Sequence, residues 1–447
     1  MRTTDNNNGK DIKELSIAES RKEDIQNLRI IANKKISDIK PENYPDLFVF
    51  PPYDHGHGDE IAKGTIFSLN DTNIKTNNIM GFVGVNDTRL TITSRFAKDD
   101  TNDYFLHYML QKVLSINIVH LDQSKRKESL WNFLPYLFPY YLKRALSQGI
   151  YRSYQTIKSN DLNVKGVIDI KRHINRNNPF SGRIAYINRI YSTCNDVIKL
   201  IRHTIEKINS NKLTSHVLKS DRETIGAVQQ IISSTGYFNK NDCNKIINRN
   251  RKSLRHPYFN KYRDLQKLCM LILRHEKLSY GDEKDKIYGL LFDGAWLWEE
   301  YLGKILHDKF IHPQNRTGSH QDFLFQDEKN NNFQKIYPDF IKKTEPIIIA
   351  DAKYKFLNYS GYEEDYGSSD YYQILAYMFR YSSKLGYLFF PYNKSYGQSI
   401  FKKLYKIKDT GASLTILGLP IPQNSENFAM FIQQIKECES KFIREIN

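Results

Sequence analysis

Cysteine is scarce in this sequence, and its scarcity excludes a disulfide-stabilised secreted fold. The 447 residues contain four cysteines, and no two of them form a CxxC pair. They are scattered at Cys194, Cys243, Cys269 and Cys438. This usage predicts a reducing, cytoplasmic compartment.

Long apolar runs and nucleotide-binding glycine loops are also absent from the sequence. No stretch of about 18 apolar residues is present, so we expect no membrane span. The residues from Met1 to Asn8 lack the apolar core of a signal peptide. No G-x-x-x-x-G-K-[ST] loop occurs, and we therefore expect no P-loop motor within this chain.

Acidic residues are in the minority, which gives the chain a clear positive charge. There are 66 Lys and Arg against 50 Asp and Glu, a formal net charge of +16, and the pI is near 9.3. Hydrophobic residues make up 40% of a chain long enough for two or three domains, which predicts a folded protein. The charge favours a polyanionic partner, nucleic acid first and an anionic membrane surface second. A generally Lys-rich proteome is the alternative explanation.

The most informative pattern lies in two short stretches near residue 340. The run Ile347–Ala352 is apolar and mostly β-branched, which predicts a buried strand. Asp351 and Lys353 are two residues apart, so their side chains share one face. A turn at 342–346 allows the strand that carries Asp339 to pair with this one. Two carboxylates and one lysine are therefore expected to converge.

This combination of residue types suits metal-assisted chemistry. Two carboxylates at an open strand end provide the oxygen ligands that Mg²⁺ prefers. Lys353 is placed to orient a water molecule or to stabilise developing negative charge. The alternative is an ordinary Asp–Lys ion pair at the protein surface.

Predicted helices on either side of these strands bring further polar residues. Periodicity predicts a helix over Leu291–Leu306, which carries the acid Glu299 beside Trp296 and Leu302; the adjacent Glu300 is the alternative inward-facing acid.

After the strands, a helix over Asp370–Arg380 places Gln373 and Tyr377 one turn apart on one face. Asp370 and Gln373 have the spacing of a capping box at the start of this helix.

Elsewhere the sequence offers weaker signals. His55 and His57 lack further ligands, which favours a polar loop over a metal site. The aromatic stripe over Leu130–Leu146 is more typical of a core than of a base-stacking surface. The basic residues Arg172, His173, Arg176, Arg183 and Arg189 either meet phosphates or form a solvated surface.

The two strands and the two helices together resemble the PD-(D/E)xK nuclease superfamily in its D-x-K variant, including a Gln-x-x-x-Tyr element. From about Gly81 to the C-terminus the chain resembles the McrC family, the nuclease subunits of McrBC modification-dependent restriction systems. The segments that carry this resemblance are Gly81–Val85, Leu90–Ile92, Gly149–Arg152, Lys165–Asp169, Asn195, Leu297–Tyr301, Pro338–Asp339, Asp351–Lys355 and Asp370–Gln373.

The resemblance implies an α+β multidomain fold. The expected parts are a polar helical extension (1–43), a β-rich N-terminal domain for partner docking (44–97), a mostly helical middle (98–285) and a C-terminal α/β PD-(D/E)xK restriction-endonuclease-like core (286–447). The polar extension and the long helical middle depart from the family pattern.

The resemblance also implies a Mg²⁺-dependent DNA endonuclease that works with a McrB-like AAA+ GTPase ring on double-stranded DNA, with no membrane partner. Asp339, Asp351, the Ala352 carbonyl and Glu299 are the expected metal ligands, and Lys353 completes the catalytic set. Gln373 and Tyr377 are expected to hold the neighbouring phosphate or the lysine. The alternatives are an autonomous PD-(D/E)xK nuclease in DNA repair and a non-catalytic activator of an AAA+ NTPase.

Overall fold

A computed structural model gives the fold, and it forms two compact units. The first unit comprises Met1–Asp122 and Glu283–Asn447, and the second comprises Gln123–Asp282. The structure describes residues 1–7, 9–11, 22–38, 46–51, 64–70, 73–86, 88–97, 103–114, 134–212, 214–274, 287–313, 322–342, 344–356, 368–393 and 400–446. His55 and His57 lie outside these ranges.

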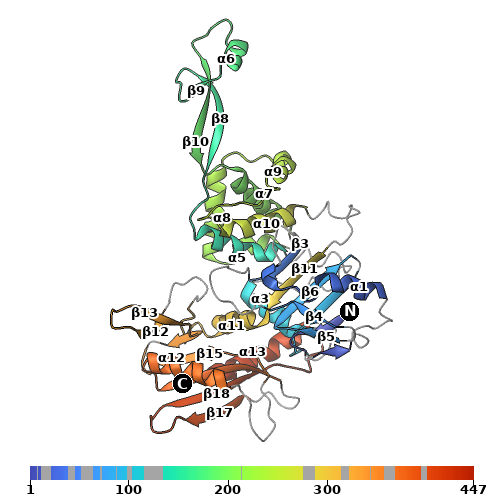
Figure 1. Cartoon of the computed structure of the whole chain (residues 1–447), viewed down its shortest axis with the longest axis vertical. Helices are drawn as coiled ribbons and strands as arrows, with labels where there is room; N and C mark the ends of the chain where they lie inside the picture. The colour runs from blue at the N-terminus through green and yellow to red at the C-terminus, as the bar shows by residue number, and fades with distance from the viewer. Residues whose placement is uncertain are drawn as a thin grey trace. The chain divides into compact units, whose positions relative to one another are not determined.

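The first unit contains a five-stranded sheet, called the first sheet here, built from both chain segments of this unit (Figure 1). Its spatial order is β1 (Arg2–Thr4), β7 (Thr88–Thr93), β6 (Ile79–Val85), β11 (Ile287–Asp293) and β3 (Asp46–Phe50). Strands β6 and β7 form an antiparallel hairpin. Helix α1 (Lys22–Ile31) packs against β6 and β7, and its Leu28 and Ile31 are buried with Val83 and Ile92. A small sheet adds β2 (Lys10–Asp11), β5 (Asn73–Thr76) and β4 (Phe67–Leu69).

Two strands of the first sheet were not predicted. Strand β1 pairs in parallel with β7, so the first residues are part of this sheet although the sequence suggested a polar helical extension. Strand β11 ends at Asp293, whereas the sequence predicted that the helix had already begun at Leu291. Asp293 accepts from the N–H groups of Ala295 and Trp296, and this N-cap makes α11 (Gly294–Ile305) begin after the strand.

The second sheet of this unit is mixed and has helices on both of its faces. Its spatial order is β14 (Phe340–Lys342), β15 (Ile348–Ala352), β16 (Leu385–Tyr392), β18 (Ser413–Pro420) and β17 (Phe401–Lys406). Strands β15, β16 and β18 are parallel, while β14 and β17 are antiparallel edges. The C-terminal part therefore contains both helices and strands, as expected. A separate hairpin, β12 (Asp322–Gln326) and β13 (Asn332–Ile336), precedes it.

Consecutive residues of β16 show which helices cover each face of the second sheet. Leu388 is buried in the cluster that includes Ile374 and Met378 of α12 (Ser368–Arg380). Phe389 faces the other way and contacts Phe442 of α13 (Phe428–Arg444) at a ring-centroid separation of 5.3 Å. Since side chains alternate along a strand, α12 and α13 cover opposite faces. A further helix, α3 (Tyr104–Leu114), packs on α11 and α13.

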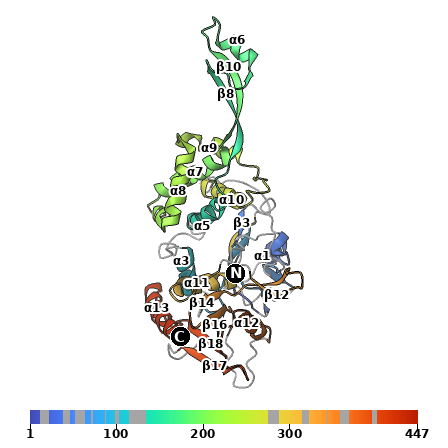
Figure 2. The same cartoon turned by 90° about the vertical axis from the view of Figure 1, so that its left-hand side faces the viewer.

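The second unit is a helical bundle that carries a long two-stranded ribbon (Figures 1 and 2). The bundle helices are α5 (Leu134–Leu146), α7 (Asp196–Ser210), α8 (Arg222–Thr235), α9 (Cys243–Arg249) and α10 (Lys261–Arg274). Short 3₁₀ turns occur at Ile36–Asp38 in the first unit and at Ser215–Lys219 and Lys240–Asp242 in the second. Tyr136, Phe138 and Tyr141 of α5 are buried, as expected for a core stripe. Pro139 lies inside α5 without ending it.

The ribbon pairs β8 (Ser153–Asp161) with β10 (Ile184–Ser192), and β9 (Val167–Ile168) and α6 (Ile170–Arg176) lie at its tip. The sequence analysis expected a mostly helical middle (98–285), so this long ribbon was not predicted. In the described ranges no helix is both long and apolar enough to cross a membrane.

Candidate active site

Asp339 and Asp351 are brought together by the pairing of β14 with β15. Phe340 is opposite Ala350 in this antiparallel pair, so Asp339 lies beside the end of β15, one residue before β14 rather than within a strand. The Asp339 Oδ2 atom accepts a hydrogen bond of 2.7 Å from the N–H of Ala352. Asp351 is 3% exposed. The two carboxylates therefore meet at one end of the sheet, as the sequence predicts.

Lys353 joins Asp351 to α12. Its N–H extends the strand pairing by donating to the Phe389 carbonyl at 2.8 Å. Its Nζ atom lies 2.5 Å from Asp351 Oδ2 and donates to Gln373 Oε1 at 2.7 Å. Gln373 in turn donates to the Tyr377 hydroxyl at 2.9 Å. The predicted shared face of Gln373 and Tyr377 is thus turned towards the lysine.

Asp370 has a role that the sequence analysis missed. Helix α12 begins at Ser368, so Asp370 lies inside the helix, and the expected capping box with Gln373 is wrong. The buried Asp370 carboxylate instead pairs with Lys355 Nζ at 2.6 Å and lies 3.6 Å from Lys353 Nζ. The sequence did contain a signal for this role, because Asp370 is an acidic residue near the start of the helix that also carries Gln373.

Helix α11 contributes acidic residues from the side of β15 opposite to α12. The Trp298 indole donates to the carbonyl of Phe389 at 3.3 Å, the same oxygen that receives the Lys353 N–H. This contact fixes α11 beside the lysine. Glu299 is close enough to raise the pKa of Asp339, after burial and the charge of Asp351. Of the two adjacent acids, Glu299 is therefore the one whose charge acts on Asp339.

His312 is a second residue that the sequence analysis missed. Its Nδ1 atom lies 2.8 Å from the Asp339 carbonyl oxygen, and its Nε2 atom lies 3.8 Å from carboxylate oxygens of both Glu299 and Glu300. Its ring stacks on Phe340, and a Cβ on Gly303 would come within 2.8 Å of it. No local pattern signals this position, because a bridge between Ile311 and Ile341 places the histidine there.

The cluster carries more negative than positive charge. Burial raises the pKa of Asp339 well above its usual value, and the charges of Asp351 and Glu299 raise it further. Burial by itself lowers the pKa of Lys353, but the charge of Asp351 and its hydrogen bond produce a net increase. For His312, burial is outweighed by Glu300 and Glu299, and the pKa rises to about 9. A cation bound here would relieve the repulsion between the acids. Asp339, Asp351, Lys353, Glu299 and Gln373 are called the acid–lysine cluster below.

The donor set of this cluster suits Mg²⁺. Within the ranges that the structure describes, no group of three or more His, Cys, Asp or Glu side chains is arranged to hold a metal ion. Mg²⁺ is commonly held by one or two carboxylates and keeps several waters, so three protein side chains are not required. Asp339 and Asp351 meet this requirement, and the excess negative charge is the observation that favours a cation.

The basic residues of the ribbon are divided between structural and exposed positions. Arg172 donates to the backbone carbonyls of Ser159 and Tyr186 at 2.8 and 2.6 Å, so its guanidinium supports the ribbon tip. The Arg189 guanidinium lies over the Tyr154 ring. Arg176 and Arg183 are exposed. The phosphate-binding interpretation therefore does not suit Arg172.

Fold and cluster together define an α+β multidomain protein with an acid–lysine cluster at the end of a mixed sheet. A family model described as "McrBC 5-methylcytosine restriction system component" matches residues 74–391, which include the whole cluster. The chain belongs to this McrBC family.

Solved structures of distant relatives are also similar in part. One is a chain of a refined half-complex from a tetradecameric assembly of Thermococcus gammatolerans McrB AAA+ hexamers with bound McrC; it is 14% identical, with a TM-score of 0.45 and 100% coverage of both chains. Another, from a Thermococcus gammatolerans McrBC complex, is 12% identical with a TM-score of 0.29, and the match covers 69% of this chain and 88% of that one. No curated protein matches.

Proposed function

We propose that this protein is the Mg²⁺-dependent, PD-(D/E)xK-type DNA endonuclease of a McrBC-like restriction system. The observation that carries the proposal is the position of Lys353, whose ammonium group contacts Asp351 and Gln373 beside Asp339. Membership in the McrBC family supports the restriction role.

Asp339, Asp351 and the Ala352 carbonyl would hold the ion, with Glu299 near them. Bound Mg²⁺ would polarise the scissile phosphate and lower the pKa of the attacking water. In the hydrolysis, the water oxygen bonds to phosphorus, one phosphorus–oxygen ester bond breaks, and a proton reaches the departing oxygen.

Lys353 has one donor left for this reaction. An ammonium group has three N–H donors, and among the described residues Asp351 and Gln373 accept from it at hydrogen-bond distance. Asp370, at 3.6 Å, is too distant for a good hydrogen bond. The remaining N–H would orient the water or contact a phosphate oxygen as its negative charge increases. Gln373, held by Tyr377, keeps the ammonium group in place.

We also propose that an AAA+ GTPase ring is the partner and that the ribbon contacts it. The sequence has no P-loop of its own. Large apolar side chains are exposed along the ribbon: Tyr154, Leu162, Val167, Ile170, Ile174 and Phe180, which are between 58% and 77% exposed. Apolar groups exposed in such number are typical of a surface that another protein covers. This site differs from residues 44–97, which the sequence analysis suggested for docking.

The test is a cleavage assay on methylated and unmethylated DNA, with the purified chain, Mg²⁺, and a McrB-like AAA+ ring with GTP. The proposal predicts cleavage only when chain, ring and Mg²⁺ are all present, and none after chelation by EDTA. Strong cleavage without the ring would favour an autonomous nuclease. Stimulated GTP hydrolysis without any cleavage would favour a non-catalytic activator.

A further inference from the structure

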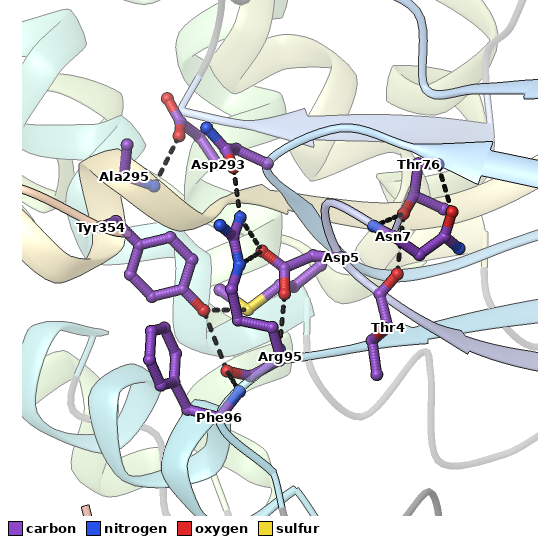
Figure 3. Close-up of polar contacts among 12 residues, drawn as sticks. Thr4, Asp5, Asn7, Thr76, Arg95, Phe96, Asp293, Ala295 and Tyr354 are labelled. Carbon is purple, nitrogen blue, oxygen red and sulfur yellow. Dashed lines mark hydrogen bonds and ion pairs between the residues drawn. The ribbon is translucent and has the colours of Figure 1, made fainter. Parts of the chain in front are cut away.

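We propose that Tyr354 is a positioning residue that fixes Lys353 and α11 against the first sheet, through a buried Asp5–Arg95 pair. The inference rests on the proposed nuclease function, because it concerns how the acid–lysine cluster is held. Tyr354 follows Lys353 directly, so the two side chains point to opposite faces at the end of β15. The Tyr354 ring lies beside Phe96 and Arg95, on the side of the first sheet (Figure 3).

The hydroxyl and the ring of Tyr354 both contact the first sheet. The residue is 3% exposed, and its hydroxyl lies 2.9 Å from Ser94 Oγ and 3.3 Å from Met80 Sδ. Ser94 follows β7, and Met80 lies in β6. The ring packs edge-on against Phe96 at 5.2 Å. One side chain therefore joins the end of β15 to two strands of the other sheet.

The same ring also packs against the start of α11. A Cβ atom on Gly294 would lie 2.8 Å from Tyr354 Cε1, so the ring occupies the space that this glycine leaves open. Gly294 is the first residue of the helix that carries Glu299. Tyr354 thus contacts the two elements that supply the two sides of the cluster. A displacement of its ring would move Lys353 relative to Glu299.

The ring is held on its other side by a buried ion pair. The Arg95 guanidinium lies 4.9 Å from the centre of the Tyr354 ring. Its Nη2 atom is 2.6 Å from Asp5 Oδ2, and the backbone N–H of Arg95 donates to Asp5 Oδ1 at 2.5 Å. Asp5 and Arg95 are 1% and 8% exposed. Asn78 also accepts from this guanidinium. A cation that is fully paired in this way is held in one orientation under the ring.

The segment that carries Asp5 is itself fixed to the first sheet and to the small sheet that contains β5. The N–H of Asp5 donates to the Thr93 carbonyl at 2.8 Å. The Thr76 hydroxyl donates to the Thr4 carbonyl at 2.7 Å, and the N–H of Asn7 donates to that hydroxyl at 3.1 Å (Figure 3). The first sheet therefore holds Asp5, and Asp5 holds the Arg95 guanidinium. Arg95 in turn supports the ring of Tyr354, which adjoins Lys353.

The inference is tested with the variants Tyr354→Leu, Tyr354→Phe and Gly294→Ala in the full chain with its ring partner. DNA cleavage is measured well below the melting temperature of each variant. For Tyr354→Leu we expect kcat for cleavage to fall about 10-fold while the Kd for DNA and GTP hydrolysis by the ring are unchanged. Tyr354→Phe keeps the ring and should stay within about threefold of the wild type. Gly294→Ala pushes the ring from the opposite side and should also lower kcat. Gly226→Ala, in α8, is the control, because a Cβ there meets nothing within 4 Å.

A second readout separates this inference from the proposed function. The Mg²⁺ concentration that gives half of the Mg²⁺-induced rise in melting temperature is measured without DNA, and it should increase several-fold in Tyr354→Leu and Gly294→Ala. If the wild type binds Mg²⁺ but does not cut DNA, the proposed function fails while this readout still tests the positioning role. Unchanged kcat and unchanged Mg²⁺ dependence in both variants would overturn the inference. If Tyr354→Leu does not fold, Gly294→Ala decides alone.

Discussion

The acid–lysine cluster and the ribbon use their side chains in opposite ways. In the cluster, charged groups are withdrawn from water and paired with one another: Asp351 is 3% exposed and contacts Lys353, which also contacts Gln373. On the ribbon, apolar groups are left in water, and Leu162 and Val167 are 76% and 77% exposed.

Both arrangements cost free energy in the isolated chain, and this shared cost indicates where function lies. A cation relieves the repulsion between buried carboxylates, and contact with another protein removes exposed apolar surface from water. The cluster therefore predicts a metal-assisted reaction, and the ribbon predicts a macromolecular partner. Substitutions in the two regions should separate cleavage from partner binding.

The largest effect is expected from Lys353→Met. This change removes the ammonium group that lies between Asp351 and Gln373, and cleavage should fall by at least about 100-fold. Lys355→Met is the matched control, because Lys355 lies two residues further on, is half-exposed and contacts Asp370 alone among the cluster's neighbours that the structure describes. The cleavage rates of the wild type and of both variants are measured. Similar losses of cleavage rate in both variants would show that Lys353 has no special role.

A double change on the ribbon, Leu162→Ser with Val167→Ser, should affect binding to the partner ring. Removing two exposed apolar side chains should raise the Kd for the ring by at least about 10-fold, which corresponds to about 1.4 kcal/mol of binding free energy. The melting temperature should stay the same because neither side chain is buried. Binding is measured by titration with the purified ring. Tyr237→Ser is the control, since Tyr237 is 90% exposed in the same unit but outside the ribbon; equal weakening there would contradict a ribbon-specific contact.

A smaller effect is expected from His312→Ala. The imidazole contacts the Asp339 carbonyl and lies near Glu299, so its loss should lower the cleavage rate by about 10-fold without affecting binding to the ring. His307→Ala is the control because that side chain is 70% exposed. Cleavage and ring binding are measured in parallel, and an unchanged cleavage rate would show that His312 does not support the cluster.

The elements that the sequence predicts correctly are those specified by neighbouring residues. The apolar run before Asp351 forms β15, and the periodic segment from Asp370 to Arg380 lies in α12. Spacings of two and four residues likewise bring Asp351 to Lys353 and Gln373 to Tyr377.

The elements that were missed depend on contacts between distant residues. Strand β1 is held by parallel pairing with β7, about 90 residues away, and its three residues are too few to show a period. The ribbon strand β8 has no buried residue, so it lacks the alternation of apolar and polar side chains that marks a half-buried strand. His312 reaches the cluster only through the bridge between Ile311 and Ile341.

The most direct test of the central claim is a paired assay of Asp351→Asn with the ring, GTP, Mg²⁺ and methylated DNA. This change removes one negative charge from a buried position while keeping the shape of the side chain. The account predicts that DNA cleavage is lost while binding to the ring and stimulation of its GTP hydrolysis stay at the wild-type level. Cleavage by Asp351→Asn at the wild-type rate would contradict the assignment of the cluster as the cleavage site.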